Sequence, residues 1–187
     1  MHAVLVHGWK GWPENAWFPW LRRELEARGW TTEALKLPDP AFPKRMEWMK
    51  AIAEAIRSPQ TVLIGHSLGT LAILWTLEKY DGPPITGVVL VSGFGRDFHV
   101  PGLHTWFPRE PDLDLIRTKA KQWRVVHARG DYLVPFREGQ WLARKLDVSV
   151  ITTKRMGHLT DEERAFEVPE ILEATLSVVW GRVEVSS

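Results

Sequence analysis

The chain has 187 residues, of which 44% are hydrophobic and 25% charged, a length and composition typical of one ordinary globular domain. Its 24 Lys and Arg residues against 23 Asp and Glu residues leave a formal charge of +1, which argues against nucleic acid or a membrane surface as a partner. The absence of cysteine excludes disulfides, thiolate metal sites and a thiol nucleophile.

Two further features of the composition bear on where the protein works. The first residues include no basic leader, and no apolar run approaches the roughly 18 residues that span a bilayer. We therefore expect a cytoplasmic protein without a targeting or membrane-spanning segment.

The sequence contains a single asparagine and no cysteine, a pattern typical of thermophilic proteins. A genome of biased base content would produce the same pattern.

Short apolar runs alternate with helical patterns along the whole chain. The first run, residues 2–8, ends in glycine, as expected of a buried parallel strand. In residues 14–30 apolar side chains recur about once per helical turn, and Gly29 is the expected end of this helix. The strands predicted in this way are 2–8, 31–37, 61–65, 85–93, 122–130 and 148–154. The predicted helices are 14–30, 44–57, 68–80, 112–120, 136–146 and 169–180.

The second predicted helix and the segment after the fourth strand allow more specific predictions. The helix is expected to bury the face formed by Met46, Met49, Ile52, Ala53 and Ile56. Residues 94–111 are irregular and rich in Pro, Gly and aromatic residues, and they are too few to form a domain of their own.

Strand and helix alternate without an internal repeat or a low-complexity linker. Each parallel crossover must be right-handed and long enough to hold a helix, so the alternation predicts a parallel sheet with helices on both faces. The fold class is therefore α/β, and residues 1–187 are expected to form a single doubly wound domain.

Ser67 lies at the junction of a predicted strand and helix, with Gly65 and Gly69 two residues to either side. The turn is so tight that larger side chains at these two positions would collide with the neighbouring strand and helix. The strained turn lifts the hydroxyl clear of the sheet edge, as in the G-x-S-x-G nucleophile elbow. Capping of the helix is the alternative role for such a serine, but the strand-turn-helix context favours a nucleophile.

A serine nucleophile needs a base and a group that orients the base. His158 follows the sixth predicted strand and Asp131 follows the fifth, so both emerge at the same sheet edge as Ser67 and in the chain order Ser, Asp, His. Asp97, after the fourth strand, is the rival acid. Simple turns are the alternative explanation for Asp131 and His158 taken one at a time.

The predicted oxyanion hole consists of two backbone N–H groups, one from Leu68 after the serine and one from Trp9 in the loop after the first strand. His7 flanks that loop and is expected to shape it. His66 is inside the elbow, and its side chain is expected to point away from the hydroxyl.

The segments "HGWKGWPENAWFPWL", "LPDP", "LIGHSLGTLAIL", "ARGDYLVP" and "MGHL" occur in this order along the chain. Together they resemble the compact α/β-hydrolases grouped with retinoblastoma-binding protein 9, over about residues 2–180. The resemblance implies a minimal α/β-hydrolase fold with strand order 2-1-3-4-5-6 and no lid domain. It also implies a Ser67, Asp131 and His158 triad.

These residues predict a serine hydrolase that cleaves a small acyl ester through an acyl-enzyme intermediate, without a metal or organic cofactor. A thioesterase or amide hydrolase with the same triad is the runner-up, and a binding module acting through the Trp-rich surface is the alternative of another class. The sequence leaves the oligomeric state open.

Six aromatic residues of the first loop and of the segment after the fourth strand are candidates for the wall of the substrate pocket: Trp12, Trp17, Phe94, Phe98, Trp106 and Phe107. Packing in the core under these loops is the alternative interpretation for each of them.

Overall fold

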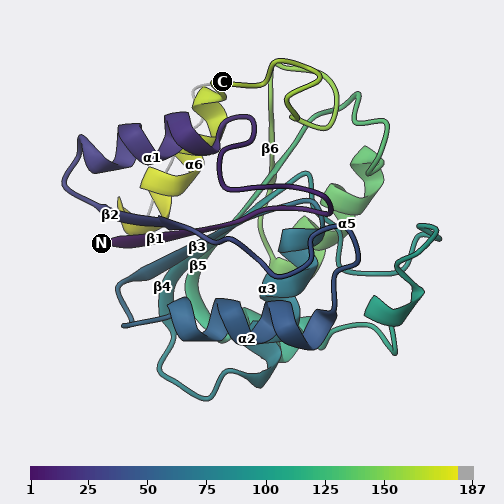
Figure 1. Ribbon diagram of the computed structural model, residues 1–187. Coiled ribbons are helices and arrows are strands. Elements are labelled where there is room, and N and C mark those ends of the chain that lie inside the picture. Colours follow the sequence, from purple (N-terminus) through teal and green to yellow (C-terminus); the bar gives the residue numbers. More distant parts are fainter. Residues whose placement is uncertain (181–187) are drawn as a thin grey trace.

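The computed structural model describes residues 1–180, and its core is a six-stranded sheet in which all the neighbouring strands are parallel. The order across the sheet is β2-β1-β3-β4-β5-β6, as the resemblance implies (Figure 1). The strands are β1 (His2–Val6), β2 (Thr31–Ala34), β3 (Thr61–His66), β4 (Ile85–Val91), β5 (Ala120–His127) and β6 (Val150–Thr152).

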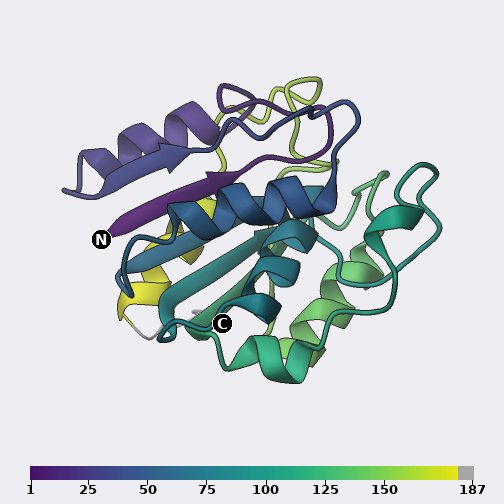
Figure 2. The same cartoon turned by 60° about the horizontal axis from the view of Figure 1, so that its bottom comes forward.

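Helices cover both faces of the sheet (Figures 1 and 2). One face carries α1 (Phe18–Glu26) and α6 (Pro169–Trp180). The other carries α2 (Arg45–Ala55), α3 (Leu68–Lys79), α4 (Leu113–Arg117) and α5 (Phe136–Leu146). Within residues 1–180, no helix combines the length and the apolar character needed to span a membrane.

The central strands β1, β3 and β4 read as nearly continuous apolar runs because each of them contributes side chains to two hydrophobic cores. In β1, Val4 and Val6 pack with α2 and α3, whereas Ala3 and Leu5 face α1 and α6. Successive side chains point to opposite faces of a strand, so a strand that is covered on both faces needs apolar residues at every position. This pattern is what made the strands recognisable in the sequence.

The first helix is shorter than predicted. It spans Phe18–Glu26 instead of 14–30, because Trp17 is its N-cap residue and Pro19 lies in the first turn, where the missing N–H costs nothing. Gly29, with φ 79°, follows the helix end. The Trp-rich segment before the helix is therefore a loop, and it leads from the end of β1 across the edge of the sheet.

The buried face predicted for the second helix is partly wrong. Met46 is 65% exposed and Ala53 is also exposed, whereas Trp48 is fully buried. The indole of Trp48 donates a hydrogen bond to the Pro38 carbonyl oxygen at 2.8 Å. A buried indole removes far more apolar surface from water than a methionine at the helix start, so the helix turns its Trp48 side to the sheet.

No separate domain is inserted after β4 in the described part of the chain. Residues 94–111 form a loop whose single regular element is a 3₁₀ turn, η1 (His104–Trp106). Because all the strands are parallel, the loops that follow β1, β3, β4, β5 and β6 lie at the same edge of the sheet, where the carboxyl ends of the strands are. No inserted domain covers this edge in the described residues, and ligands bind at this edge in open α/β sheets.

The start of α3 approaches the end of β1 very closely at Gly69. A Cβ atom there would overlap the Val6 carbonyl oxygen and lie 2.6 Å from the His7 carbonyl oxygen. The sequence predicts such a collision, and the structure identifies the backbone of β1 and the loop after it as the obstacle. Gly69 therefore sets how near the first loop can come to the elbow.

We expect Gly69→Ala to lower the free energy of unfolding by about 1–3 kcal/mol, because the added methyl group must push the two backbones apart. At an unobstructed helix position the same change stabilises by about 1 kcal/mol, so the sign of the effect is diagnostic. Urea unfolding of the two proteins measures it. Equal or higher stability of the variant would contradict the close approach.

Candidate active site

Ser67 occupies the turn between β3 and α3 in a conformation that non-glycine residues rarely adopt, with φ 53° and ψ −122°. Its side chain makes no capping hydrogen bond to α3, which removes the alternative explanation for a serine at this position. Gly65 faces the helix, and a Cβ atom on it would lie 2.7 Å from Ile73 Cδ1. The turn is thus strained, and it leaves no room for a side chain at Gly65.

The loop after β1 lies directly against Ser67. A Cβ atom on Gly8 would be 2.9 Å from Ser67 Cβ and 3.5 Å from its Oγ. The next backbone N–H, that of Trp9, and the N–H of Leu68 donate no hydrogen bond to any group within residues 1–180. Two free donors near one hydroxyl are the arrangement that an oxyanion hole requires.

His158 and Asp131 form a buried hydrogen-bonded pair. His158 Nδ1 lies 2.8 Å and 3.0 Å from the two carboxylate oxygens of Asp131, and the carboxylate also accepts hydrogen bonds from the backbone N–H groups of Leu133 and Val134. Burial alone would raise the pKa of Asp131, but these hydrogen bonds and the charge of His158 hold it below its usual range. The acid therefore stays ionised beneath the imidazole.

Asp97, the rival acid, takes no part in this pair. It is exposed, and its carboxylate accepts a hydrogen bond from the backbone N–H of His99 at 2.7 Å within its own loop. The structure thus brings Asp131 and not Asp97 to His158.

Glu163 stabilises the loop around His158 by hydrogen bonds, a role that was not predicted from the sequence. Its carboxylate accepts hydrogen bonds from the backbone N–H groups of His158 and Thr160, both at 2.8 Å. A Cβ atom on Gly157 would overlap this carboxylate. The T-x-x-E spacing from Thr160 to Glu163 is that of a capping box, and it is the local signal that could have identified Glu163.

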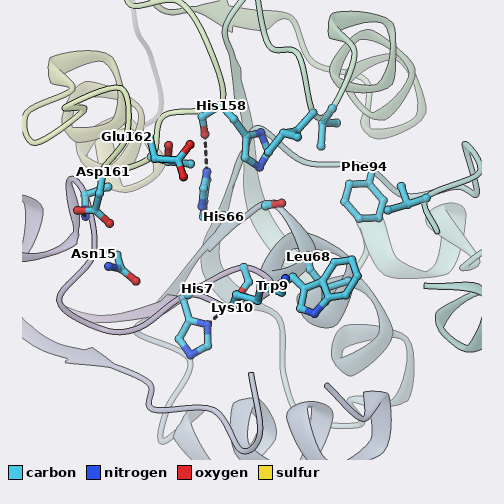
Figure 3. Close-up of a pocket in the computed structure, with 18 of the residues that line it drawn as sticks. His7, Trp9, Lys10, Asn15, His66, Leu68, Phe94, His158, Asp161 and Glu162 are labelled. Atoms are coloured by element: carbon cyan, nitrogen blue, oxygen red, sulfur yellow. Dashed lines mark hydrogen bonds between the residues drawn. The ribbon is translucent and has the colours of Figure 1, made fainter. Parts of the chain in front are cut away.

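His66 also contacts His158 directly, and this contact was not predicted from the sequence. Its Nε2 lies 2.8 Å from the carbonyl oxygen of His158, and the two imidazole rings are 4.9 Å apart at their centres. Figure 3 shows this contact as a dashed line. Burial, reinforced by the charge of His158, lowers the pKa of His66 to about 3.

Two other histidines support neighbouring parts of the site. His127 Nε2 donates a hydrogen bond to the Val134 carbonyl oxygen at 2.9 Å and lies 3.5 Å from a carboxylate oxygen of Asp131. The ring therefore packs against the Asp131 carboxylate. His7 donates to the Gly8 carbonyl oxygen at 2.8 Å, in keeping with its expected effect on the first loop. Burial lowers the pKa of both imidazoles, which favours their neutral forms.

A cavity of about 550 Å³ opens over Ser67 and His158. Figure 3 shows Trp9, Leu68 and Phe94 on one side of it and Asn15, Asp161 and Glu162 on the other. Further apolar side chains of the wall come from the loop after β4 and from the rim; they are Trp12, Phe98, Val100, Leu103, Leu133 and Val134. The cavity thus has an apolar side and a polar side, and Ser67 is part of its lining.

Three of the six aromatic residues expected in the pocket wall lie elsewhere. Trp17 is fully buried between α1 and the sheet, and Trp106 and Phe107 pack into the core on the other face. For these three the packing interpretation is correct, whereas the other three do line the cavity; they are Trp12, Phe94 and Phe98. In residues 1–180 no three His, Asp or Glu side chains are arranged to hold a metal ion.

Comparisons with known proteins identify the family of this chain. The family model described as serine hydrolase matches residues 3–176. The chain is 29% identical over 179 residues to YdeN of Bacillus subtilis (strain 168), which is provisionally named a hydrolase, with 94% of each chain covered. The crystal structure of the ydeN gene product matches with a TM-score of 0.88 and 28% identity, over 97% of this chain and 99% of that one. The esterase domain of a Rhodothermus marinus protein shares the fold, with a TM-score of 0.70 and 16% identity, over 95% of this chain and 85% of that one.

The lowered pKa of His66 predicts a loss of stability in acid. Between pH 6.5 and about 3 the unfolded chain binds a proton at this residue and the folded chain does not, so acid favours unfolding by up to about 1.4 kcal/mol per pH unit. We expect His66→Gln to make the free energy of unfolding less dependent on pH between 6.5 and 4.5. Urea unfolding at three pH values measures the slope.

The matched control for this prediction is His104→Gln, because His104 is exposed. In this control the free energy of unfolding should depend on pH as steeply as in the wild type. If it depends on pH just as steeply in His66→Gln, His66 is not buried in its neutral form.

Proposed function

The chain belongs to the serine hydrolase family, and we propose that it is a carboxylesterase-like enzyme that cleaves a small acyl ester with Ser67, His158 and Asp131 as its triad. The observation that carries the proposal is the buried His158–Asp131 hydrogen bond in the wall of the cavity that holds the strained Ser67. A base, its orienting acid and a nucleophile at one sheet edge are the parts that acyl transfer needs.

The hydrogen bond to Asp131 determines the role of His158. Because Nδ1–H donates to the carboxylate, the lone pair of Nε2 is left to take the proton of Ser67 Oγ. No capping hydrogen bond to α3 occupies the Ser67 hydroxyl. The hydrogen bond between a catalytic serine and its base commonly tightens only when substrate binds. The serine oxygen then attacks the acyl carbon, and His158 passes the proton to the departing alcohol.

The free N–H groups of Trp9 and Leu68 are suited to hold the oxygen that becomes negative in this step. They flank Ser67 from the first loop and from the start of α3, so the charge develops between two fixed backbone donors. A water molecule, activated by the same imidazole, completes the cycle by hydrolysing the acyl-enzyme. The water oxygen bonds to the acyl carbon as the bond to Ser67 Oγ breaks, and His158 passes the proton of the water to Oγ, so the carboxylic acid leaves and the site is restored.

The cavity supports a small-molecule substrate with an apolar acyl part. The wall formed by Phe94, Phe98, Val100 and Leu103 offers apolar surface beside the hydroxyl, and the volume of about 550 Å³ suits short to medium acyl chains. The same triad could cleave a thioester or an amide, but no contact in the site favours either. The compact chain without an inserted domain also supports a place among the hydrolases grouped with retinoblastoma-binding protein 9.

The proposal is tested with p-nitrophenyl esters of increasing acyl length, for the wild type and two aspartate variants. We expect hydrolysis by the wild type, and a fall in kcat of about 10³–10⁴-fold in Asp131→Asn, because the amide no longer fixes the imidazole in the useful tautomer. Asp97→Asn is the matched control and should keep kcat within about twofold.

Two results would contradict this assignment. Equal losses in the two variants would remove Asp131 from its role. No hydrolysis of any ester by the folded wild type would favour the alternative of a binding module that acts through the Trp-rich surface, where Trp12 is exposed beside Tyr132 and Leu133 on the cavity rim.

A further inference from the structure

The segment that carries His158 lacks regular secondary structure. β6 ends at Thr152 and α6 begins at Pro169, and the residues on either side of His158 have left-handed backbone conformations, with φ 86° at Gly157 and φ 61° at Leu159. The backbone of His158 is therefore held by side chains instead of by a helix or a strand.

Two side chains hold the two ends of this backbone unit. Glu163 accepts a hydrogen bond from the His158 N–H at 2.8 Å, and His66 Nε2 lies 2.8 Å from the His158 carbonyl oxygen. Glu163 belongs to the same loop, whereas His66 is the last residue of β3 and immediately precedes Ser67. The His66 contact therefore ties the loop of the base to the turn of the nucleophile across 92 positions of sequence.

The direction of this hydrogen bond follows from the chemistry of its partners. A carbonyl oxygen can only accept, so His66 Nε2 must carry the proton. Burial keeps the pKa of His66 near 3, and the neutral ring has only this one proton to donate. His66 is therefore committed to the His158 backbone and is not a second base for Ser67.

The ring of His66 is itself fixed by packing. It lies against the His158 ring at 4.9 Å between centres, and Trp17 meets it edge-on at 5.9 Å and 88°. Trp17, which does not line the cavity, thus supports the site from the core side through His66.

We propose that His66 is a positioning residue, which holds the His158 backbone so that the imidazole faces Ser67. The proposal rests on the proposed function for the role of His158. Its physical basis is that an error of about 1 Å in the placement of a catalytic group can cost about 100-fold in rate. A residue that is only part of the core would not need a hydrogen-bond donor at this position.

Two variants separate the donor from the packing. His66→Leu keeps an apolar side chain but has no donor, and His66→Gln places an amide N–H within reach of the carbonyl. The matched control is His2→Leu, because His2 also makes a side-chain hydrogen bond, to Thr31, but lies at the start of β1, at the opposite edge of the sheet. Thermal unfolding of each protein accompanies the kinetics.

For p-nitrophenyl butyrate we expect kcat of His66→Leu to fall by about 10- to 100-fold with KM within about twofold, because the acyl wall is untouched. His66→Gln should recover kcat to within about fivefold of the wild type, and His2→Leu should match the wild type. Full activity in His66→Leu would overturn the proposal. So would a loss in His66→Gln as large as that in His66→Leu.

A second measurement does not depend on activity, so it separates this proposal from the proposed function. The Nδ1 proton of His158 should give a downfield NMR signal from its hydrogen bond to Asp131, assigned by its absence from His158→Ala. We expect the signal in the wild type and in His66→Gln and its loss or broadening in His66→Leu. An unchanged signal in folded His66→Leu would overturn the positioning role, whether or not esters are cleaved.

Discussion

A buried carboxylate stays charged only if hydrogen-bond donors replace the water that it has lost, and the site depends on how Asp131 meets this condition. Its donors are two backbone N–H groups of its own loop and the imidazole of His158. The same bonds that stabilise the charge therefore join the loop after β5 to the loop after β6. The ionised acid fixes the tautomer of His158, and in the proposed mechanism this tautomer makes the imidazole available as a base.

The remaining parts of the site depend on how closely backbones approach one another. Gly8 and Gly69 lack side chains where the first loop, the serine turn and the start of α3 meet, so the backbones of these three segments come close together. His66 connects this turn to the loop of the base. Three segments far apart in the sequence are thereby held as one unit at the edge of the sheet. The loop after β4 adds an apolar wall to the cavity, which the proposed function assigns to the substrate.

Much of this arrangement could be predicted from the sequence because it depends on local patterns. Continuous apolar runs indicate strands buried on both faces, and glycines two residues before and after a serine indicate the turn. Asp131 and His158 were predictable because parallel strands end at one edge. The contacts of His66 were not predictable, since they depend on the path of a loop 92 residues away. Nor could composition distinguish Trp12, which lines the cavity, from Trp17, which lies five positions later in the core.

A fluorophosphonate probe shows most directly whether Ser67 is an activated nucleophile. Such a probe reacts with a serine whose hydroxyl is deprotonated by a neighbouring base and whose oxyanion is stabilised. We expect one adduct per folded chain, located on Ser67 by peptide mass spectrometry and absent from Ser67→Ala. If the folded wild-type protein forms no adduct, or if the adduct persists in Ser67→Ala, Ser67 is not an activated nucleophile.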